Sequence, residues 1–457
     1  MILLWLFPVS PLAAQAADTL DPVLRSRIDR IANQVIEMRG IPSASIAVVQ
    51  GGKLVYTHAY GKAHLDPPKE ATPGMRYSIG SISKQFTAAA ILILQEQGKL
   101  SLDDAVGKYV PGLTRGDEVT IRQILSHTSG YQDYWPEDYL MTPMTKPETA
   151  QQIVDTWAKK PLDFDPGTQW QYSNTNFVIA GLIVEKVSGQ KLMDFLGEHI
   201  FHPLGMKSVW DSDETKLTST DATPYIRAAL GPLRLAPKEG RGWMFAAGEL
   251  AMTPHDLALW DISLMQQSVL KSDSYKEMFT EVKLKDGKGT HYGLGVGVSE
   301  EGGRRTIEHS GEVTGFVSDN EVLLDDGVAV AVTTNHMEGG AGQIAALVAA
   351  AVAGNAHQND AEKQALAIYR DLQKGRIDRN LLAPNLNDYF SEQTVADFRD
   401  SLGPLGEPLS FHQTAEGQRG GMTFHAFRIQ YPARRLSLTT YTYPDGKLEQ
   451  YLVGPAE

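Results

Sequence analysis

The segment from Ser81 to Leu94 constrains the fold most, because it predicts a helix that is apolar on almost every side. Phe86 is followed by an unbroken apolar run from Ala88 to Leu94. A helix that is hydrophobic all round is buried in a protein core or in a membrane. This run falls well short of the ~20 residues that a membrane span requires. We therefore expect the helix to pack inside a dry core.

Ser81 and Lys84 stand at the start of this helix and could carry chemistry. Residues three apart lie on one helix face, so the Lys84 amine can reach the Ser81 hydroxyl. Against a dry core, a primary amine is shifted towards its neutral form and can accept a proton. A serine with a lysine base can form a covalent acyl-enzyme. The S-x-x-K spacing alone is weak, because an N-capping serine explains it equally well.

Two further motifs follow in order. Tyr172 and Asn174 form a Y-x-N motif just before an apolar helical segment, and His309 and Gly311 form an H-x-G motif at the end of a short strand. With S-x-x-K, these motifs resemble those of the penicillin-recognising serine hydrolases. That family comprises class C β-lactamases, D-alanyl-D-alanine carboxypeptidases, D-aminopeptidases and related esterases. The resemblance covers roughly residues 20 to 354.

The resemblance implies a role for each motif residue. Ser81 attacks a carbonyl carbon, and Lys84 takes its proton, alone or jointly with Tyr172. The phenol of Tyr172 then passes a proton to the leaving group. Asn174 orients Lys84 and offers its amide to the substrate. As an alternative to these roles, Tyr172 could be a core aromatic residue with a satisfied hydroxyl.

The third motif adds substrate contacts to this picture. By resemblance, the backbone N–H groups of Ser81 and Glu312 form the oxyanion hole. Gly311 suits a strand edge that a substrate backbone approaches closely. His309 replaces the lysine with which β-lactamases bind the antibiotic's carboxylate, and neutral imidazole is a weaker anchor. His309 could instead be a strand-end residue bonded to backbone. His127, in a Leu-Ser-His-Thr-Ser-Gly segment, is expected to be structural.

The pattern of elements predicts an α+β fold of the β-lactamase and transpeptidase type for residues 17–354. Helical spacing at 21–39 and strands at both ends of this domain predict an antiparallel sheet flanked by helices, built from both chain ends. An all-helical region inserted between the strands is expected to carry the Y-x-N motif. We interpret the glycines at 293–297 as part of a strand, because no helix follows them as a nucleotide-binding loop requires. The expected strands cover 45–50, 54–60, 291–299, 306–308, 316–324 and 328–334, and the expected helices 121–126, 149–159, 177–187, 192–201 and 341–353.

Beyond residue 354 the sequence predicts a separate small unit. Residues 355–360 are polar and typical of a linker, and residues 361–457 predict an α+β accessory domain. Helices followed by a strand meander resemble domains of the nuclear-transport-factor type. We see no catalytic set there and expect a role in packing or in substrate gating. The expected helices cover 361–374, 385–390 and 394–402, and the expected strands 422–431, 436–443 and 448–453.

The amino terminus and the composition restrict the location and the binding partners that we expect for this protein. Residues 1–16 form a short apolar stretch ending in an A-x-A pattern, which predicts a signal peptide and export to the periplasm or outside the cell. The net charge of −13, from 42 basic and 55 acidic residues, disfavours nucleic acid and anionic membranes as partners. No segment is predicted to span a membrane.

The sequence lacks the motifs of other enzyme classes. The sequence has no cysteine, no H-E-x-x-H, no G-x-S-x-G elbow and no P-loop. We therefore expect no metal and no cofactor. The chain is predicted to be an exported serine hydrolase that cleaves D-amino-acid peptides or amides, or small esters. The alternatives are a class C-like β-lactamase, a DD-carboxypeptidase, and a non-catalytic peptide-binding protein on the same fold. In each case the expected partner is a small molecule or a short peptide.

Overall fold

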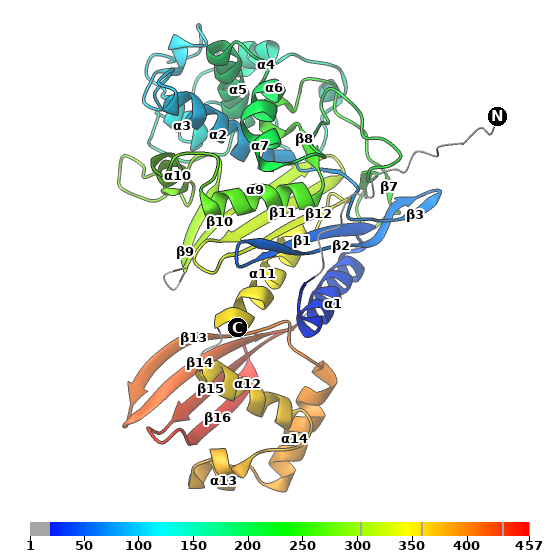
Figure 1. Cartoon of the computed structure of the whole chain (residues 1–457), viewed down its shortest axis with the longest axis vertical. Coiled ribbons are helices and arrows are strands. Elements are labelled where there is room, and N and C mark those ends of the chain that lie inside the picture. Colours follow the sequence, from blue (N-terminus) through cyan, green and yellow to red (C-terminus); the bar gives the residue numbers. More distant parts are fainter. Residues whose placement is uncertain (1–18, 302–303, 358–359, 432–433, 457) are drawn as a thin grey trace, which may run out of the picture.

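The computed structural model describes residues 19–301, 304–357, 360–431 and 434–456. The predicted signal peptide, residues 1–16, lies outside the described residues. Within the described ranges, no helix combines the length and the apolar character needed to cross a membrane. Figure 1 shows a large unit, with a central sheet and a helical region above it, and a smaller C-terminal unit below.

A seven-stranded antiparallel sheet forms the centre of the large unit, in the order β3-β2-β1-β12-β11-β10-β9. The N-terminal hairpin joins the later strands where β1 pairs with β12, with Ile46 opposite Val332. The predicted assembly of one sheet from both ends of the domain is therefore confirmed. The strands are β1 (Ser43–Gln50), β2 (Lys53–Leu65), β3 (Pro68–Glu70), β9 (Gly297–Glu301), β10 (Arg304–Val313), β11 (Phe316–Leu323) and β12 (Val328–Thr334).

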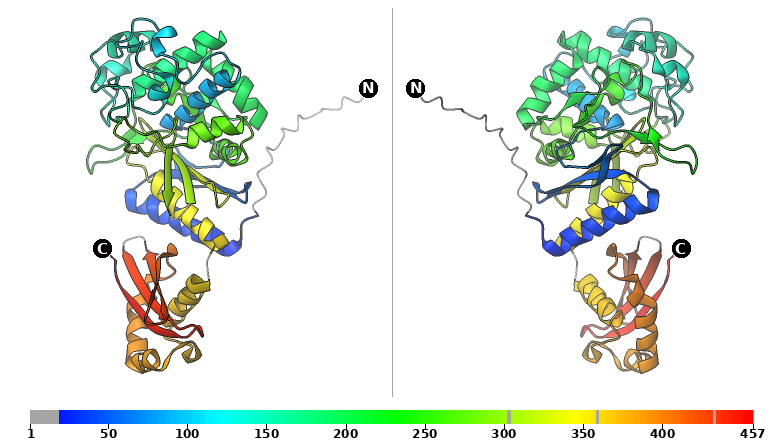
Figure 2. Two further views of the ribbon diagram at one scale, coloured as in Figure 1. Left: turned by 90° about the vertical axis from the view of Figure 1, so that its left-hand side faces the viewer. Right: turned by 90° about the vertical axis from the view of Figure 1, so that its right-hand side faces the viewer.

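Helices cover both faces of this sheet, as Figures 1 and 2 show. Along β1, Ile46 and Val48 pack in a core with the helices α1 and α11, whereas Ala47 and Val49 belong to the core on the opposite face, with α9. This alternation follows from the two-residue period of a strand. It explains the continuous apolar run from Ile46 to Val49 in β1. The covering helices are α1 (Pro22–Arg39), α9 (Pro254–Gln266) and α11 (Ala341–His357).

The helical region is inserted between β3 and β9, as predicted. It also contains short strands, in a small sheet of order β4-β8-β5 and a hairpin of β6 and β7. Its helices are α2 (Ser83–Glu96), α3 (Ile121–Leu125), α4 (Ala150–Trp157), α5 (Asn174–Ser188), α6 (Leu192–Leu196), α7 (His202–Leu204), α8 (Phe245–Gly248) and α10 (Ser272–Phe279). The short strands are β4 (Tyr77–Ser78), β5 (Trp210–Asp211), β6 (Tyr225–Ile226), β7 (Arg234–Leu235) and β8 (Leu250–Met252).

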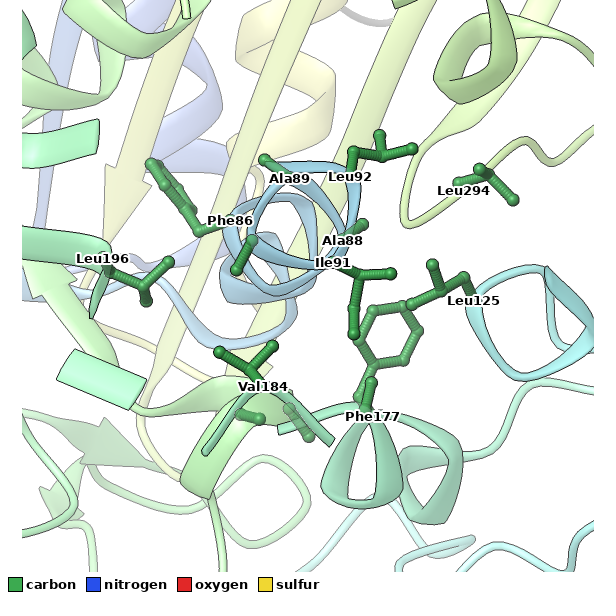
Figure 3. Packing of buried hydrophobic residues seen from close by; sticks show 14 of the residues in the cluster. Phe86, Ala88, Ala89, Ile91, Leu92, Leu125, Phe177, Val184, Leu196 and Leu294 are labelled. Atoms are coloured by element: carbon green, nitrogen blue, oxygen red, sulfur yellow. The ribbon is translucent and has the colours of Figure 1, made fainter. Parts of the chain in front are cut away.

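Helix α2 lies at the centre of the larger core, as its apolar surface predicts. Every residue from Ser83 to Leu94 is buried. Figure 3 shows Phe86 and Ile91 projecting in different directions, with Phe177 of α5 among the neighbouring side chains. Burying one such aromatic or branched side chain contributes about 1.5–3 kcal/mol. The helix that carries the candidate catalytic pair is thus fixed from all sides.

The prediction of a glycine-rich strand at 293–297 is wrong for most of this segment, because β9 begins only at Gly297. Of the glycines before it, Gly293 packs against the carbonyl oxygen of Met278 in α10, and Gly295 packs against α2. Gly295 has a left-handed backbone (φ 71°), and a Cβ built on it would lie 2.8 Å from the carbonyl oxygen of Lys84. Glycine is needed here for close packing against the helix backbone, a use that sequence pattern alone does not separate from a strand.

The C-terminal unit packs three helices on a four-stranded antiparallel meander of order β13-β14-β15-β16. The side chain of Arg27 in α1 donates a hydrogen bond to the carbonyl oxygen of Leu409, linking the two units. The elements are α12 (Asp360–Leu372), α13 (Pro384–Tyr389), α14 (Glu392–Leu402), β13 (Ser410–Arg419), β14 (Met422–Gln430), β15 (Arg435–Thr442) and β16 (Leu448–Pro455).

Two details of this unit differ from the expectations. Helix α11 continues to His357, so the first part of the segment predicted as a linker at 355–360 is helical. Strand β13 has no counterpart among the predicted strands, because most of its residues are polar and exposed at the sheet edge. The resemblance to the nuclear-transport-factor type stays a prediction.

Candidate active site

Ser81 is held in a tight turn where α2 meets strand β10. It lies in the 3-10 turn η1 (Gly80–Ile82), which runs directly into α2. Gly80 has a left-handed backbone (φ 51°), and a Cβ built on it would lie 2.6 Å from the backbone nitrogen of Glu312. A side chain at position 80 would therefore separate the turn from β10. The Ser81 side chain is half-buried and lines a cavity.

The Lys84 side chain is fully buried and lies against three oxygen atoms. Its Nζ is 2.8 Å from Ser81 Oγ, 2.8 Å from Asn174 Oδ1 and 2.7 Å from the carbonyl oxygen of Ala247. Burial lowers the pKa of Lys84 to about 7, although the Asp133 carboxylate acts in the opposite direction. In its neutral form the amine has two N–H groups for the two carbonyls and a lone pair for the serine hydroxyl. It is therefore arranged to accept the proton of Ser81.

Tyr172 completes the predicted trio. It lies two residues before α5, and its hydroxyl group interacts with the Ser81 side chain. The centre of its ring is 4.9 Å from Lys84 Nζ. Burial raises the pKa of the Tyr172 phenol above its ordinary value. The phenol is thus protonated at neutral pH, which makes Lys84 the resting base and Tyr172 a proton donor.

Asn174 is oriented by Asp133, a residue that the sequence analysis missed. The backbone N–H of Asn174 donates to Asp133 Oδ1 at 2.9 Å, and its Nδ2 donates to the same carboxylate at 3.2 Å. These bonds leave the Asn174 side-chain oxygen facing Lys84, as the predicted orienting role requires. Asp133 could not be found from spacing, because it belongs to none of the three motifs.

His127 acts as a structural residue, in agreement with the sequence interpretation. It is fully buried, and its Nδ1 accepts a hydrogen bond from the backbone N–H of Ser173 at 3.1 Å. Its ring packs on that of Tyr172, with ring centres 4.3 Å apart. Burial holds the pKa of His127 well below its ordinary value, so the ring is neutral. It supports the catalytic phenol without facing the substrate cavity.

His309 is close to Tyr172 but does not line the Ser81 cavity. Its Nε2 lies 2.8 Å from the Tyr292 hydroxyl, and its Nδ1 lies 2.5 Å from the carbonyl oxygen of Ser310. Burial lowers the pKa of His309 to about 4, so the ring is neutral. It lines a neighbouring cavity of about 460 Å³, which also borders Tyr172. A substrate contact of His309 would therefore be made from that side.

Gly311 and Glu312 bring β10 against the Ser81 turn. A Cβ built on Gly311 would lie 1.8 Å from the carbonyl oxygen of Ile79. The close approach expected of a substrate backbone is thus made, in this structure, by the protein's own chain. Because a Cβ on Gly80 would lie 2.6 Å from the Glu312 backbone nitrogen, that nitrogen lies against the turn that holds Ser81. The oxyanion hole formed by the Ser81 and Glu312 N–H groups stays a prediction.

The Ser81 cavity has a volume of about 590 Å³ and an acidic wall. Among the described residues that line it, none is a lysine, an arginine or a histidine. Burial and the nearby Asp138 raise the pKa of the Glu312 carboxyl. Glu137 Oε2 is buried without a hydrogen-bond partner. The acidic side chains of the lining are Asp133, Glu137, Asp138 and Glu312, and its aromatic side chains are Tyr134, Trp135, Tyr139, Trp170 and Tyr172.

This wall was not visible in the sequence, because its residues belong to a loop at 133–139 and to the end of β10. Neither segment has a regular spacing that would predict which side chains meet. In the described part of the chain, no group of three or more His, Cys, Asp or Glu side chains is arranged to hold a metal ion. The site consists of protein groups suited to proton transfer and acyl transfer.

Comparisons with known proteins agree with this geometry. A D-aminopeptidase of Brucella anthropi is 31% identical over 318 residues, which cover 66% of this chain and 58% of that protein. The chain thus spans less than two thirds of that relative's length. A solved D-stereospecific amidohydrolase from Streptomyces sp. is 27% identical, with a TM-score of 0.63 over 72% of this chain and 98% of the other.

A third likeness extends over the C-terminal unit. The penicillin-binding protein homologue from Pyrococcus abyssi has a TM-score of 0.64 over 95% of this chain and 96% of its own. At 21% identity this likeness concerns the fold alone. The family model described as beta-lactamase matches residues 28–354, a stretch that contains all three motifs. The chain therefore belongs to the beta-lactamase family.

Proposed function

We propose that this protein is a serine hydrolase that forms an acyl-enzyme on Ser81 and cleaves the amide bond beside a free amino group. D-amino-acid amides and short peptides with an N-terminal D-residue are the favoured substrates, and small esters of the same acyl groups are also accepted. The observation that carries the proposal is the buried Lys84 amine, 2.8 Å from the Oγ of Ser81, a residue that lines an acidic cavity.

Acylation begins with a proton transfer within the trio of Ser81, Lys84 and Tyr172. Ser81 Oγ attacks the substrate carbonyl carbon while its proton moves to Lys84. The carbonyl oxygen becomes an oxyanion between the backbone N–H groups of Ser81 and Glu312. As the C–N bond breaks, Tyr172 donates its proton to the departing amine and regains one from Lys84. The acyl group is then an ester on Ser81.

Deacylation repeats these steps with water as the nucleophile. A water molecule loses a proton to the trio as it attacks the ester carbon, and Ser81 Oγ recovers a proton as the C–O bond breaks. Lys84 and Tyr172 return to their starting protonation states. The products are a carboxylic acid and a free amine. The first transfer uses atoms that are already in contact in the resting structure, Ser81 Oγ and Lys84 Nζ, and the Tyr172 ring lies beside both residues.

The acidic wall favours a substrate that carries an ammonium group over one that carries a carboxylate. An ammonium bound to Glu312 or Asp138 would form a charge-assisted hydrogen bond, which contributes about 1.5–3 kcal/mol. A substrate carboxylate, as in a β-lactam or a C-terminal D-alanine, would meet carboxylates in this cavity. The β-lactamase and DD-carboxypeptidase alternatives are therefore disfavoured. The names of the D-aminopeptidase and D-stereospecific amidohydrolase relatives support the same substrate class.

A matched set of substrates tests this proposal. D-phenylalanine amide, its L-enantiomer, N-acetyl-D-phenylalanine amide and a chromogenic cephalosporin are compared with the wild type and with Ser81→Ala. We expect the D-amide to be hydrolysed, N-acetylation to lower kcat/KM at least tenfold, and Ser81→Ala to be inactive. Efficient cephalosporin hydrolysis would favour the β-lactamase alternative. A wild type inactive on all four compounds would favour a binding protein.

A variant of Glu312 tests the contribution of the acidic wall with the same substrates. Glu312→Gln keeps the backbone N–H and the side-chain shape but removes the negative charge. We expect it to raise KM for D-phenylalanine amide, with no comparable change for the N-acetylated amide, which lacks the ammonium. An equal effect on both amides would contradict amine recognition by this carboxylate.

Export is a second part of the proposal, supported by the apolar N-terminal stretch and the A-x-A pattern of residues 1–16. Expression of the full chain in a Gram-negative host, followed by fractionation and N-terminal sequencing, tests it. We expect the protein in the periplasm or the medium, with Ala17 as its first residue. An uncleaved chain in the cytoplasm would contradict the proposal.

A further inference from the structure

A second large cavity, of about 740 Å³, adjoins the active site through helix α8. Ala247 in α8 lines the Ser81 cavity and accepts the Lys84 contact, whereas Phe245 in the same helix lines the second cavity. The second cavity contains none of the residues placed in the catalytic machinery. Its function is not explained by hydrolysis at Ser81.

Glu249, just after α8, is the most unusual residue of this cavity. Its side chain is only 4% exposed. Its carboxyl group forms no hydrogen bond with any residue in the described part of the chain. Burial and the charges of Asp211 and Asp213 raise its pKa well above the ordinary value. Neither of its oxygens is among the buried side-chain atoms without a partner, so both open onto the cavity, where a ligand can reach and satisfy them.

The two neighbouring aspartates are satisfied only by backbone donors. Asp213 accepts hydrogen bonds from the N–H groups of Gly242 and Phe245, each at 3.0 Å. Asp211 accepts from the N–H groups of Asp213 and Glu214, also at 3.0 Å. Burial raises the pKa of Asp213 to about 6. Three acidic side chains thus meet at one wall with no salt-bridge partner among the described residues.

The two basic residues that line the cavity are already engaged. Lys191 Nζ lies 3.6 Å from Glu185 Oε2, and Arg241 Nη1 lies 3.3 Å from Glu214 Oε2. Neither pair involves Glu249. Among the described lining residues the cavity therefore offers carboxyl groups in excess and no free cation. A positively charged ligand would complement it.

The other residues that line the cavity indicate which kind of positively charged ligand would fit. Leu182, Leu192, Met193 and Phe245 provide apolar surface next to the carboxyl groups. Among the described residues, the acidic side chains are not gathered as a metal ion requires. An alkyl chain bearing amino groups fits both features, because its methylene groups suit apolar surface while its ammonium groups donate to separate carboxylates.

We propose that this cavity binds an aliphatic polyamine, with its ammonium groups held by the carboxyl groups of Glu249, Asp211 and Asp213. The alkyl part of the ligand lies along the apolar side chains of α5 and α6. The site is distinct from the substrate cavity, and its occupant is not hydrolysed.

Binding of spermidine, measured by isothermal titration calorimetry in 150 mM NaCl, tests the proposal. The salt suppresses diffuse attraction to a chain of net charge −13. We expect one saturable site in the wild type, and at least tenfold weaker binding in Glu249→Gln and in Asp213→Asn. Because burial favours the neutral form of Glu249 in the empty cavity, glutamine preserves the resting shape and charge. The variant lacks only the carboxylate that forms when an ammonium group binds beside it. Thermal melts of each variant with and without spermidine give a second readout.

Two control variants locate the site. Asp194→Asn removes one charge from an exposed position on α6, outside the cavity lining. Glu312→Gln removes one charge from the substrate cavity. Both should bind spermidine as the wild type does. The proposal is overturned if the wild type shows no saturable binding, if Glu249→Gln and Asp213→Asn bind unchanged, or if Asp194→Asn or Glu312→Gln loses binding equally.

Discussion

Replacing Lys84 with methionine should abolish activity and yet change stability in a manner that depends on pH. The pKa of Lys84 falls from an ordinary value of 10.5 to about 7 on folding. Each pKa unit corresponds to 1.36 kcal/mol, so burial of this amine costs about 5 kcal/mol at or below pH 7. Between pH 7 and pH 10.5 the folded chain holds the neutral amine while the unfolded chain holds the protonated one.

The sign of the pH effect follows from this difference. Because the unfolded state binds the extra proton, the wild-type free energy of unfolding rises with pH over that range, by about 1.4 kcal/mol per unit. Methionine does not titrate. The stability advantage of Lys84→Met over the wild type should therefore shrink by about 2.5 kcal/mol between pH 7.5 and pH 9.5. Loss of the oxygen contacts of Lys84 lowers the advantage at every pH but does not change its slope.

Urea unfolding followed by tryptophan fluorescence at several pH values measures this quantity. Lys186→Met, at an exposed position on α5, is the matched control and should show a constant difference from the wild type. A Lys84→Met difference that is equally constant with pH would mean that Lys84 keeps its ordinary pKa. That result would refute the assignment of Lys84 as a neutral base.

Three further predictions follow from the site geometry. Asp133→Asn removes a charge that raises the pKa of Lys84, so the acid limb of the kcat/KM profile for D-phenylalanine amide should move to lower pH; a shift to higher pH would contradict this. Tyr172→Phe should lower kcat for the amide by about 10²–10⁴-fold and affect a p-nitrophenyl ester much less, because nitrophenolate leaves without a proton; equal losses on both substrates would argue against Tyr172 as the acid. Gly311→Ala places a Cβ 1.8 Å from a backbone carbonyl and should lower Tm and activity together, whereas Gly417→Ala, with open space around it, should change neither activity nor Tm by a comparable amount.

The sequence was sufficient to predict the Ser81–Lys84 pair of the candidate trio and the sheet that positions it. Ser81 and Lys84 are three residues apart on one helix, so their contact follows from helix geometry. The burial of α2 and the two-sided burial of β1 follow from continuous apolar runs. Only the resemblance to a known family connects Tyr172 with this pair, because 91 residues separate it from Ser81.

The remaining parts of the site depend on contacts that no local pattern encodes. Asp133 reaches Asn174 from a loop, and its role appears only when α5 is in place. The sequence pattern predicts Gly295 as a strand residue, because a glycine that packs on a helix and a glycine within a strand can have the same neighbours in sequence. The Glu249 cavity likewise combines segments that lie far apart in the chain. Such features require the folded backbone.

Covalent labelling with a fluorophosphonate probe tests the central claim most directly. The protein is incubated with the probe, digested, and mapped by mass spectrometry to locate and quantify the adduct. A nucleophilic Ser81 that transfers its proton to the neutral amine 2.8 Å away predicts a single adduct on Ser81 and labelling at least 100-fold slower in Lys84→Met. An adduct on a different residue, or an unchanged labelling rate in Lys84→Met, would contradict it.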